Sequence, residues 1–342
     1  MRAAVLRDHK LVVGEVPDPV PGPGQVLAET IACGICGSDV HMYQHLDRLT
    51  AAAKERGAPF LDPDTDVVMG HEFSARVLET GPGVTNVQPG DNVVAMPVMV
   101  TAEGGFHTVG YTAEYPGGYG EKMLLMAAVC YKIPDGLDPR HAALTEPMSV
   151  GTRAVSRSGA KEGESAIVFG CGPIGLGTIA ALRLAGVAPI VAADLSERRR
   201  ELAVHMGAEA AVDPREEPAI AAWQRIDGVR PLVIFEASGA RGLIAEAMEA
   251  APQEGRILVV GVCMEPDTIW PMMGINKELT LTFSLGARPD EFKLTLDRIA
   301  EGKIDVGAIV TDEIGIAGVP AAFETLLQPD AHGKILVRPE LG

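Results

Sequence analysis

The chain has 342 residues, a formal net charge of −17 and a hydrophobic fraction of 47%. This length exceeds one ordinary core and fits two domains, and so acidic a chain repels nucleic-acid backbones and anionic membranes, so we expect neither as a partner. The five cysteines show no disulfide-like spacing and the first residues contain no apolar signal segment, so a reducing cytoplasm is the expected location.

Short strands separated by turns are predicted for the first part of the chain. The candidate strands are residues 3–6, 25–32, 74–79 and 92–95, and Pro-Gly turns lie between them. This pattern predicts an antiparallel or mixed β domain with few helices.

Strand-like and helix-like segments alternate after about residue 148. Apolar runs at 166–169, 190–193, 232–235 and 257–260 suit buried parallel strands, and helical patterns at 174–184 and 197–206 fall between them. Ser196 is a plausible N-cap of the second helix and Gly207 its stop. The alternation predicts a doubly wound α/β sheet with right-handed crossovers.

Residues 166–193 carry a single charge, at Arg183, and are numerous enough to cross a bilayer. Glycines and Pro189 interrupt this run, so a strand, a turn, a buried helix and a second strand explain it better. Helix-like segments near 290–301 and 319–327 and strand-like segments at 279–285 and 334–338 follow.

A glycine-rich loop of the form G-x-G-x-x-G follows the strand at 166–169 and opens the next helix. Its first glycine permits a tight turn, the second lets the backbone approach a pyrophosphate at the helix N-terminus, and the third allows close packing of helix on strand. Asp194 ends the next strand, where a carboxylate would bind ribose hydroxyls and repel a 2′-phosphate, so NAD is favoured over NADP. Arg198 and Arg199 weaken this preference, because an arginine can accommodate the 2′-phosphate. The alternative is a plain strand-to-helix turn with Asp194 as a helix cap. The predicted cofactor-binding residues are Gly170, Gly172, Pro173, Ile174, Gly175, Asp194, Arg199 and Val262.

Residues of the types that bind zinc occur at separated positions. Cys33 and Cys36 have C-x-x-C spacing, but no βαβ unit surrounds them and no second cysteine pair follows, which leaves Cys36 as a lone ligand with distant partners. His71, Glu72 and Glu146 are candidate partners, and each of them alone would more often be an ordinary polar residue. Catalytic zinc takes three protein ligands with N, S or O donors and keeps one position open.

These residues lie in motifs that resemble the medium-chain dehydrogenase/reductase family, in its zinc-dependent alcohol dehydrogenase branch. The motifs are GICGSDVH at 34–41, GHEFSARVLETGPGV at 70–84, PGDNV at 89–93, GGYGEK at 117–122, TEPMSVG at 145–151, VFGCGPIGLG at 168–177 and FEASG at 235–239. The resemblance implies an α/β protein with a GroES-like β-rich catalytic domain at 1–148, a Rossmann domain at 149–286 and a return to the catalytic domain at 287–342.

The resemblance also implies roles for individual residues. Cys36, His71 and Glu146 match the zinc ligands, and Glu72 can exchange with the last of these, so the choice between the two glutamates stays open. Asp39 matches a carboxylate that orients the zinc-binding histidine. The family's structural zinc uses four cysteines, but residues 96–119 contain none, so we expect one zinc per chain and a lobe held by packing.

The function implied is NAD-linked oxidation of an alcohol, secondary or polyol, to a ketone or aldehyde, and the reverse reduction. A divalent zinc charge stabilises the alkoxide, which is a better hydride donor than the alcohol. Ser38 and His41 match the family's proton relay, and His41 suits the last step because an ordinary histidine has a pKa of about 6.5. By the same analogy we expect a homodimer or homotetramer. Two alternatives are a zinc-free enone or quinone reductase of the same superfamily and a nucleotide-binding protein without turnover.

Overall fold

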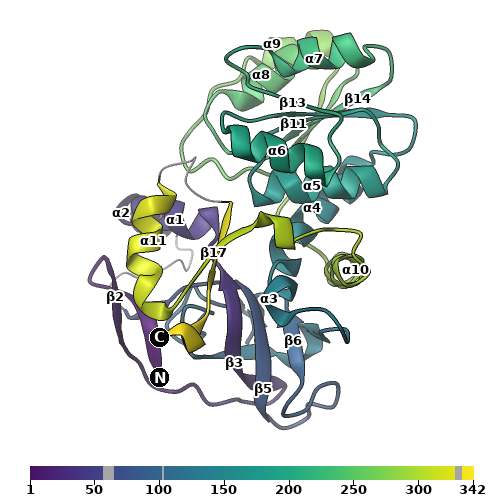
Figure 1. Ribbon diagram of the computed structural model, residues 1–342. Coiled ribbons are helices and arrows are strands. Elements are labelled where there is room, and N and C mark those ends of the chain that lie inside the picture. Colours follow the sequence, from purple (N-terminus) through teal and green to yellow (C-terminus); the bar gives the residue numbers. More distant parts are fainter. Residues whose placement is uncertain (57–64, 102–103, 328–332) are drawn as a thin grey trace. The chain divides into compact units, whose positions relative to one another are not determined.

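The computed structural model describes residues 1–56, 65–101, 104–327 and 333–342. Within these residues the chain forms two compact units, Met1–Glu146 with Leu296–Gly342 and Pro147–Thr295 (Figure 1). The chain passes from the second unit back to the first within helix α10 (Pro289–Ala300), between Thr295 and Leu296. No helix of the described residues combines the length and apolarity needed to span a membrane.

The first unit is built on a mixed seven-stranded sheet. Its strand order is β10-β6-β5-β3-β18-β17, and β9 also pairs with β3. Only β17 and β18 run parallel; the other neighbours are antiparallel. The bounds are β3 Gln25–Gly34, β5 Glu72–Thr80, β6 Asn92–Ala95, β9 Lys122–Met126, β10 Cys130–Lys132, β17 Val310–Ile314 and β18 Lys334–Val337.

Smaller elements complete this unit. The strands β1 (Arg2–Arg7), β2 (Lys10–Glu15) and β4 (Val67–Val68) form a second sheet, and β7 (Val98–Val100) pairs with β8 (Phe106–Thr108). The helices are α1 (Gly37–Gln44), α2 (Leu46–Arg56), α3 (Pro139–Ala142), the first turn of α4 (Thr145–Ser158) and α11 (Val319–Leu326). The predicted strands near 3, 25, 74 and 92 are all present, and the C-terminal strand β18 pairs with β3 of the same sheet.

The long strand β3 shows how the sequence pattern places the site. Val26, Ala28, Thr30 and Ala32 are buried, while the alternate residues 27, 29 and 31 are partly exposed, so one face of the strand packs against the core. At its end Cys33 and Gly34 are both buried, because β18 pairs with them from the other side. The end of β3 is therefore enclosed, and the chain enters α1 from there.

The second unit is a doubly wound parallel sheet, as the sequence predicts. The strand order is β13-β12-β11-β14-β15-β16 and every pair is parallel. Helices α5 and α6 lie on one face and α7, α8 and α9 on the other (Figure 1). The strands are β11 Ser165–Phe169, β12 Ile190–Ala193, β13 Ala210–Val212, β14 Leu232–Glu236, β15 Arg256–Val259 and β16 Thr280–Phe283, and the helices are α5 Pro173–Leu184, α6 Glu197–Met206, α7 Ala219–Ile226, α8 Leu243–Ala250 and α9 Pro271–Lys277.

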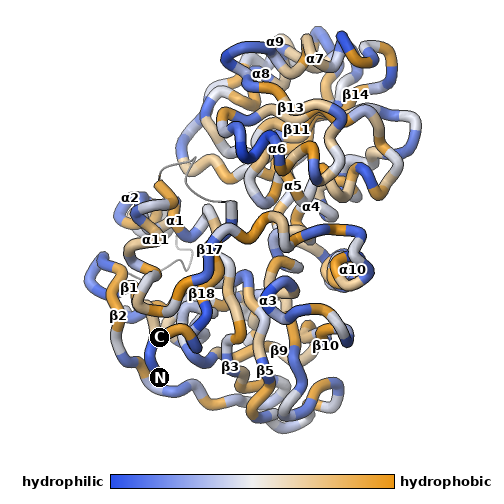
Figure 2. The backbone as a smooth tube through the Cα atoms, in the orientation of Figure 1, coloured by the Kyte–Doolittle hydropathy of each residue, from blue (hydrophilic) through white to orange (hydrophobic). Residues whose placement is uncertain are grey.

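The apolar stretch at 166–193 folds as β11, the glycine loop, α5 and β12, not as a membrane span. Figure 2 shows α5 as largely hydrophobic and α6 as largely hydrophilic. One core cluster contains Ile167, Val191, Trp223 and Ile234. The side chain of Ser196 caps the N-terminus of α6, and Gly207 ends the helix at a φ of 119°, as predicted.

Candidate metal centre and dinucleotide loop

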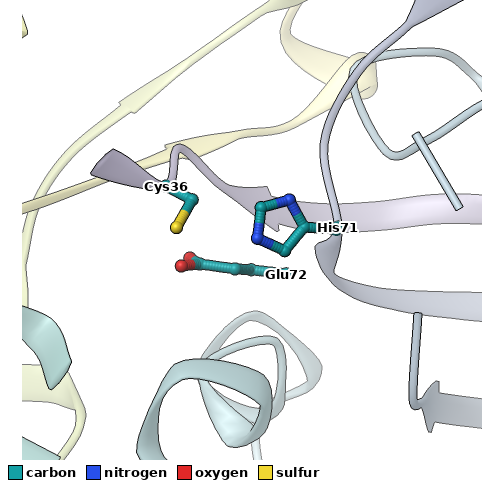
Figure 3. Close-up of side chains that lie close together, drawn as sticks. All are labelled: Cys36, His71 and Glu72. Atoms are coloured by element: carbon teal, nitrogen blue, oxygen red, sulfur yellow. The ribbon is translucent and has the colours of Figure 1, made fainter. Parts of the chain in front are cut away.

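Strand pairing brings together residues that are far apart in the sequence. Cys36 immediately precedes α1, just after β3, while His71 and Glu72 stand at the start of β5. The antiparallel register sets Gly34 opposite Glu72. The sulfur of Cys36, a ring nitrogen of His71 and a carboxylate oxygen of Glu72 lie within 4.8 Å of one another, and Figure 3 shows them pointing toward a common point.

Two glycines make room for this cluster. A Cβ at Gly34 would lie 2.2 Å from Oε2 of Glu72, so only a glycine leaves space for that carboxylate. Gly70 has a φ of +101°, and a Cβ there would lie 2.7 Å from the ring of Tyr119. Gly34 and Gly70 are thus steric requirements of the site.

A buried ion pair holds Glu72, and sequence reasoning missed it. Nζ of Lys334, at the start of β18, donates to Oε1 and Oε2 of Glu72 at 2.9 and 2.6 Å and to the carbonyl of Ile35 at 3.0 Å. Both charged side chains are almost completely buried. Burial lowers the pKa of Lys334, but Glu72 and Cys36 raise it more, so the lysine stays charged. The sequence feature that could have indicated this ion pair is the lysine that begins the otherwise apolar strand K-I-L-V.

Asp39 lies fully buried behind His71. Its Oδ1 is 3.1 Å from Nδ1 of His71 and accepts a 2.9 Å hydrogen bond from Tyr111, while Oδ2 accepts a 2.6 Å bond from Tyr119. Burial raises the pKa of Asp39, but His71 and the two tyrosine hydroxyls lower it more, so the carboxylate stays ionised. Since Nδ1 of His71 faces Asp39, Nε2 is left for a metal. The two tyrosines were not predicted as site residues.

The donor set suits zinc. A thiolate, an imidazole and a carboxylate converge, which is the mixture of S, N and O ligands that catalytic zinc takes. Burial and the neighbouring Glu72 raise the pKa of Cys36, so its thiolate is disfavoured until a cation neutralises it. Burial lowers the pKa of His71, yet Asp39 and Cys36 raise it well above the usual 6.5. The cluster therefore attracts a positive charge.

Glu146 opens α4 and is partly buried. Its pKa is raised to about 7, mainly by burial and also by the nearby Glu72, while His71 and Lys334 oppose the rise. The ligand atoms that lie within 4.8 Å of one another belong to Cys36, His71 and Glu72. Glu146 is not in that group, but the charges of His71 and Glu72 affect its pKa.

The predicted relay residues both lie on α1. Oγ of Ser38 is 3.1 Å from Sγ of Cys36, beside the cluster. His41 lies one turn further along the helix at the surface, where loss of some solvent around its ring and the neighbouring His45 lower its pKa from the usual 6.5.

The glycine loop between β11 and α5 has the geometry its sequence predicts. Gly170 has a φ of +90°, and a Cβ at Gly175 would lie 1.9 Å from the carbonyl of Gly170, so helix and loop are in direct contact. A Cβ at Gly172 would meet no atom within 4 Å. Open space therefore lies over the N-terminus of α5, where a pyrophosphate fits.

Asp194 stands at the end of β12 beside this loop. Its Oδ2 accepts a hydrogen bond from the backbone of Cys171 at 2.7 Å, and Oδ1 accepts one from Ser196 at 2.9 Å. Arg199 lies in the first turn of α6, its backbone bonded to the Ser196 cap. Val262 follows β15, half-exposed, with its carbonyl against Gly239. Asp194 thus joins the glycine loop to the turn before α6, and the side chain that caps α6 is that of Ser196.

Comparisons with known proteins agree with this geometry. Residues 22–135 match the alcohol dehydrogenase GroES-like domain, and residues 173–301 match the zinc-binding dehydrogenase domain. The (R,R)-butanediol dehydrogenase of Bacillus subtilis (strain 168) is 33% identical in an alignment that covers 99% of this chain and 100% of that protein. The chain belongs to the zinc-type medium-chain alcohol dehydrogenase family.

Other members of the zinc-type family are similar over nearly their whole length. The sorbitol dehydrogenase of Gallus gallus is 29% identical, with 90% of this chain and 88% of that protein covered. The crystal structure of the 2R,3R-butanediol dehydrogenase from Bacillus subtilis has a TM-score of 0.84 and 32% identity over 99% of both chains. A zinc-binding dehydrogenase from Sinorhizobium meliloti 1021, solved with NADP, has a TM-score of 0.84 and 27% identity over 99% of both chains. This zinc-type dehydrogenase is thus an oxidoreductase that acts on alcohols with zinc and NAD(P).

Proposed function

We propose that this dehydrogenase oxidises a secondary alcohol of a diol or polyol to the ketone, and catalyses the reverse reduction, with NAD. The observation that carries the proposal is the convergence of Cys36, His71 and Glu72 in a chain that also contains a dinucleotide loop. The relatives named for butanediol and sorbitol favour a polyol. A polar substrate also suits a catalytic centre rich in hydroxyl and carboxylate groups.

Cys36 and His71 are the proposed zinc ligands, with a glutamate as the third. Zinc supplies a Lewis acid that lowers the pKa of an alcohol brought against it. Glu72 is closer to the other two ligands, but both of its carboxylate oxygens already accept hydrogen bonds from Lys334. Lys334 therefore favours Glu146 as the resting ligand, with Glu72 able to exchange.

Ser38 and His41 are the proposed proton relay. Oγ of Ser38 stands 3.1 Å from the sulfur of Cys36, so it can accept the proton of an alcohol held at the cluster. His41 is exposed one turn along α1, where it can pass a proton to bulk water. Its pKa, which lies below 6.5, keeps it neutral and able to accept at pH 7.

The glycine loop and Asp194 are the proposed NAD site. NAD supplies the hydride acceptor. The open space over Gly172 admits the pyrophosphate, and the carboxylate of Asp194 disfavours the 2′-phosphate of NADP. Pro173, Ile174, Arg199 and Val262 are the remaining proposed contacts.

A homodimer or homotetramer in the cytoplasm is the proposed state. Strand β16 is an edge strand, and Phe283 and Leu285, in or after it, are 58% and 89% exposed. An unpaired edge with exposed apolar side chains suits burial against a second copy. All five cysteines are free thiols, as in a reducing compartment.

The test measures NAD and NADP reduction with 2,3-butanediol stereoisomers, sorbitol, threonine and a primary alcohol, with zinc counted per chain. We expect turnover with a diol or polyol, a preference for NAD, one zinc per chain and loss of turnover on chelation. The Cys36→Ala variant should lose zinc and turnover but still bind NAD. Activity that persists in metal-free protein would refute the zinc mechanism and favour the zinc-free reductase.

A further inference from the structure

A tyrosine from the segment that lacks the structural zinc cysteines reaches into the metal centre. Tyr111 follows the hairpin β7–β8, and its hydroxyl donates to Oδ1 of Asp39 at 2.9 Å. The same hydroxyl oxygen is 3.3 Å from Oγ of Ser38. Its ring lies edge-on to the imidazole of His71, with 5.3 Å between ring centres. One side chain thus contacts the relay serine, the buried carboxylate and a zinc ligand.

The backbone around Tyr111 explains this placement. Gly110 has a φ of +91°, and a Cβ there would lie 3.0 Å from the carbonyl of Gly70, so the two glycines bring their chains close together. Hydrogen bonds from Gly117 to Val68 and from Gly118 to Gly70 bind the end of the segment to the residues before His71. Backbone contacts to the metal centre therefore hold the end of this segment, in a lobe without structural zinc cysteines.

The direction of the hydrogen bonds gives Tyr111 a specific effect on Ser38. Because the phenol O–H donates to Oδ1 of Asp39, the phenol oxygen offers only lone pairs to Ser38. The serine has one hydroxyl proton and two acceptors near it, the sulfur of Cys36 at 3.1 Å and the oxygen of Tyr111 at 3.3 Å. A hydrogen bond from Ser38 to Tyr111 holds the hydroxyl with a lone pair free to accept the proton of an alcohol; the serine then releases its own proton toward His41, so Tyr111 orients Ser38 without taking up the proton.

We propose that Tyr111 is a positioning residue for alcohol oxidation: its hydroxyl joins Ser38 to Asp39, orients the serine as a proton acceptor and supports the Asp39–His71 contact. The inference rests on the proposed function. It assigns a role to a residue that spacing alone does not indicate, and it predicts effects on both turnover and zinc affinity.

Tyr119 offers a matched control. Its hydroxyl bonds the other oxygen of Asp39 at 2.6 Å, and it has no recorded hydrogen bond to Ser38 among the described residues. Tyr111→Phe and Tyr119→Phe each remove one hydrogen bond to Asp39, but only Tyr111→Phe removes the partner of Ser38. A role limited to Asp39 predicts the same phenotype for both variants.

The experiment combines chelator competition for zinc with steady-state kinetics. Both single variants should weaken zinc binding about tenfold, because each loosens the carboxylate behind His71. Only Tyr111→Phe should also lower kcat, by about tenfold to a hundredfold with little change in KM, and flatten the pH dependence of kcat. In the background of Ser38→Ala, Tyr111→Phe should cost no further turnover, because both changes disable the same group.

Several results would overturn the proposal. Wild-type zinc affinity in Tyr111→Phe would do so whatever the activity, so this outcome stays readable even if no alcohol is a substrate. Equal kinetics in the two tyrosine variants would reduce Tyr111 to a support for Asp39. Multiplying effects of Tyr111→Phe and Ser38→Ala on kcat would mean that they act independently. Absence of turnover in the wild type alone would refute the proposed function and leave the zinc measurement to decide on Tyr111.

Discussion

Replacing Lys334 with methionine should destabilise the first unit strongly. The side chains of Lys334 and Glu72 are 1% and 0% exposed, and three hydrogen bonds anchor the ammonium group. Lys334→Met keeps most of the apolar stem but leaves the carboxylate of Glu72 buried without its cation. Removal of one partner of a buried pair costs about 3–5 kcal/mol. For a folding unit of this size that is a drop in Tm of about 6–20 °C.

The measurement uses metal-free protein, so that zinc binding does not mask the loss. Calorimetry and hydrogen exchange of peptides from β3 and β18 report on the correct unit. Tryptophan fluorescence would not, because both tryptophans, Trp223 and Trp270, lie in the second unit.

The double variant Lys334→Met, Glu72→Gln is the control. Since it removes both charges, most of the lost stability should return, as buried pairs replaced together are close to neutral. Lys334→Arg should retain most stability because it keeps the charge. A Tm within about 2 °C of wild type for Lys334→Met, or no recovery in the double variant, would show that the pair does not hold these strands together.

Three further predictions concern the cofactors. A Cβ at Gly172 enters open space, so Gly172→Ala should fold normally but bind NAD about tenfold or more weakly. At Gly175 a Cβ would lie 1.9 Å from a backbone oxygen, so Gly175→Ala should lower Tm. Thermal unfolding and NAD titration distinguish the two variants, and equal behaviour would contradict the loop geometry. Zinc should bind more tightly as pH rises through neutrality, because the pKa values of Cys36 and His71 are raised in the metal-free protein and both residues must lose a proton to bind metal. Calorimetry in buffers of different ionisation enthalpy counts the protons released, and a count of zero would contradict the raised pKa values. Asp194→Asn keeps one acceptor for the loop but removes the charge, so the ratio of kcat/KM for NAD over NADP should fall by about tenfold; an unchanged ratio would refute the role of that carboxylate.

Local sequence patterns were sufficient for much of the fold. The glycines after 166–169 predict the turn, the N-cap and stop of α6 lie at Ser196 and Gly207, and glycine interruptions explain why residues 166–193 do not span a membrane. Turn chemistry, capping and apolar periodicity act over a few residues, so they can be predicted without tertiary contacts. The motif resemblance extended this to the family and to Cys36 and His71.

The surroundings of Cys36 and His71, the proposed zinc ligands, depended on the tertiary structure. The Lys334–Glu72 pair joins residues 262 positions apart through the pairing of β18 with β3, and Tyr111 reaches Asp39 across 72 positions through contact of two glycines. No local rule links such positions, because the free energy of a buried charge or hydroxyl depends on which distant strand the sheet places against it. The sequence by itself therefore determined that a zinc and a dinucleotide are used, while only the folded sheet decided which groups hold the ligands in place.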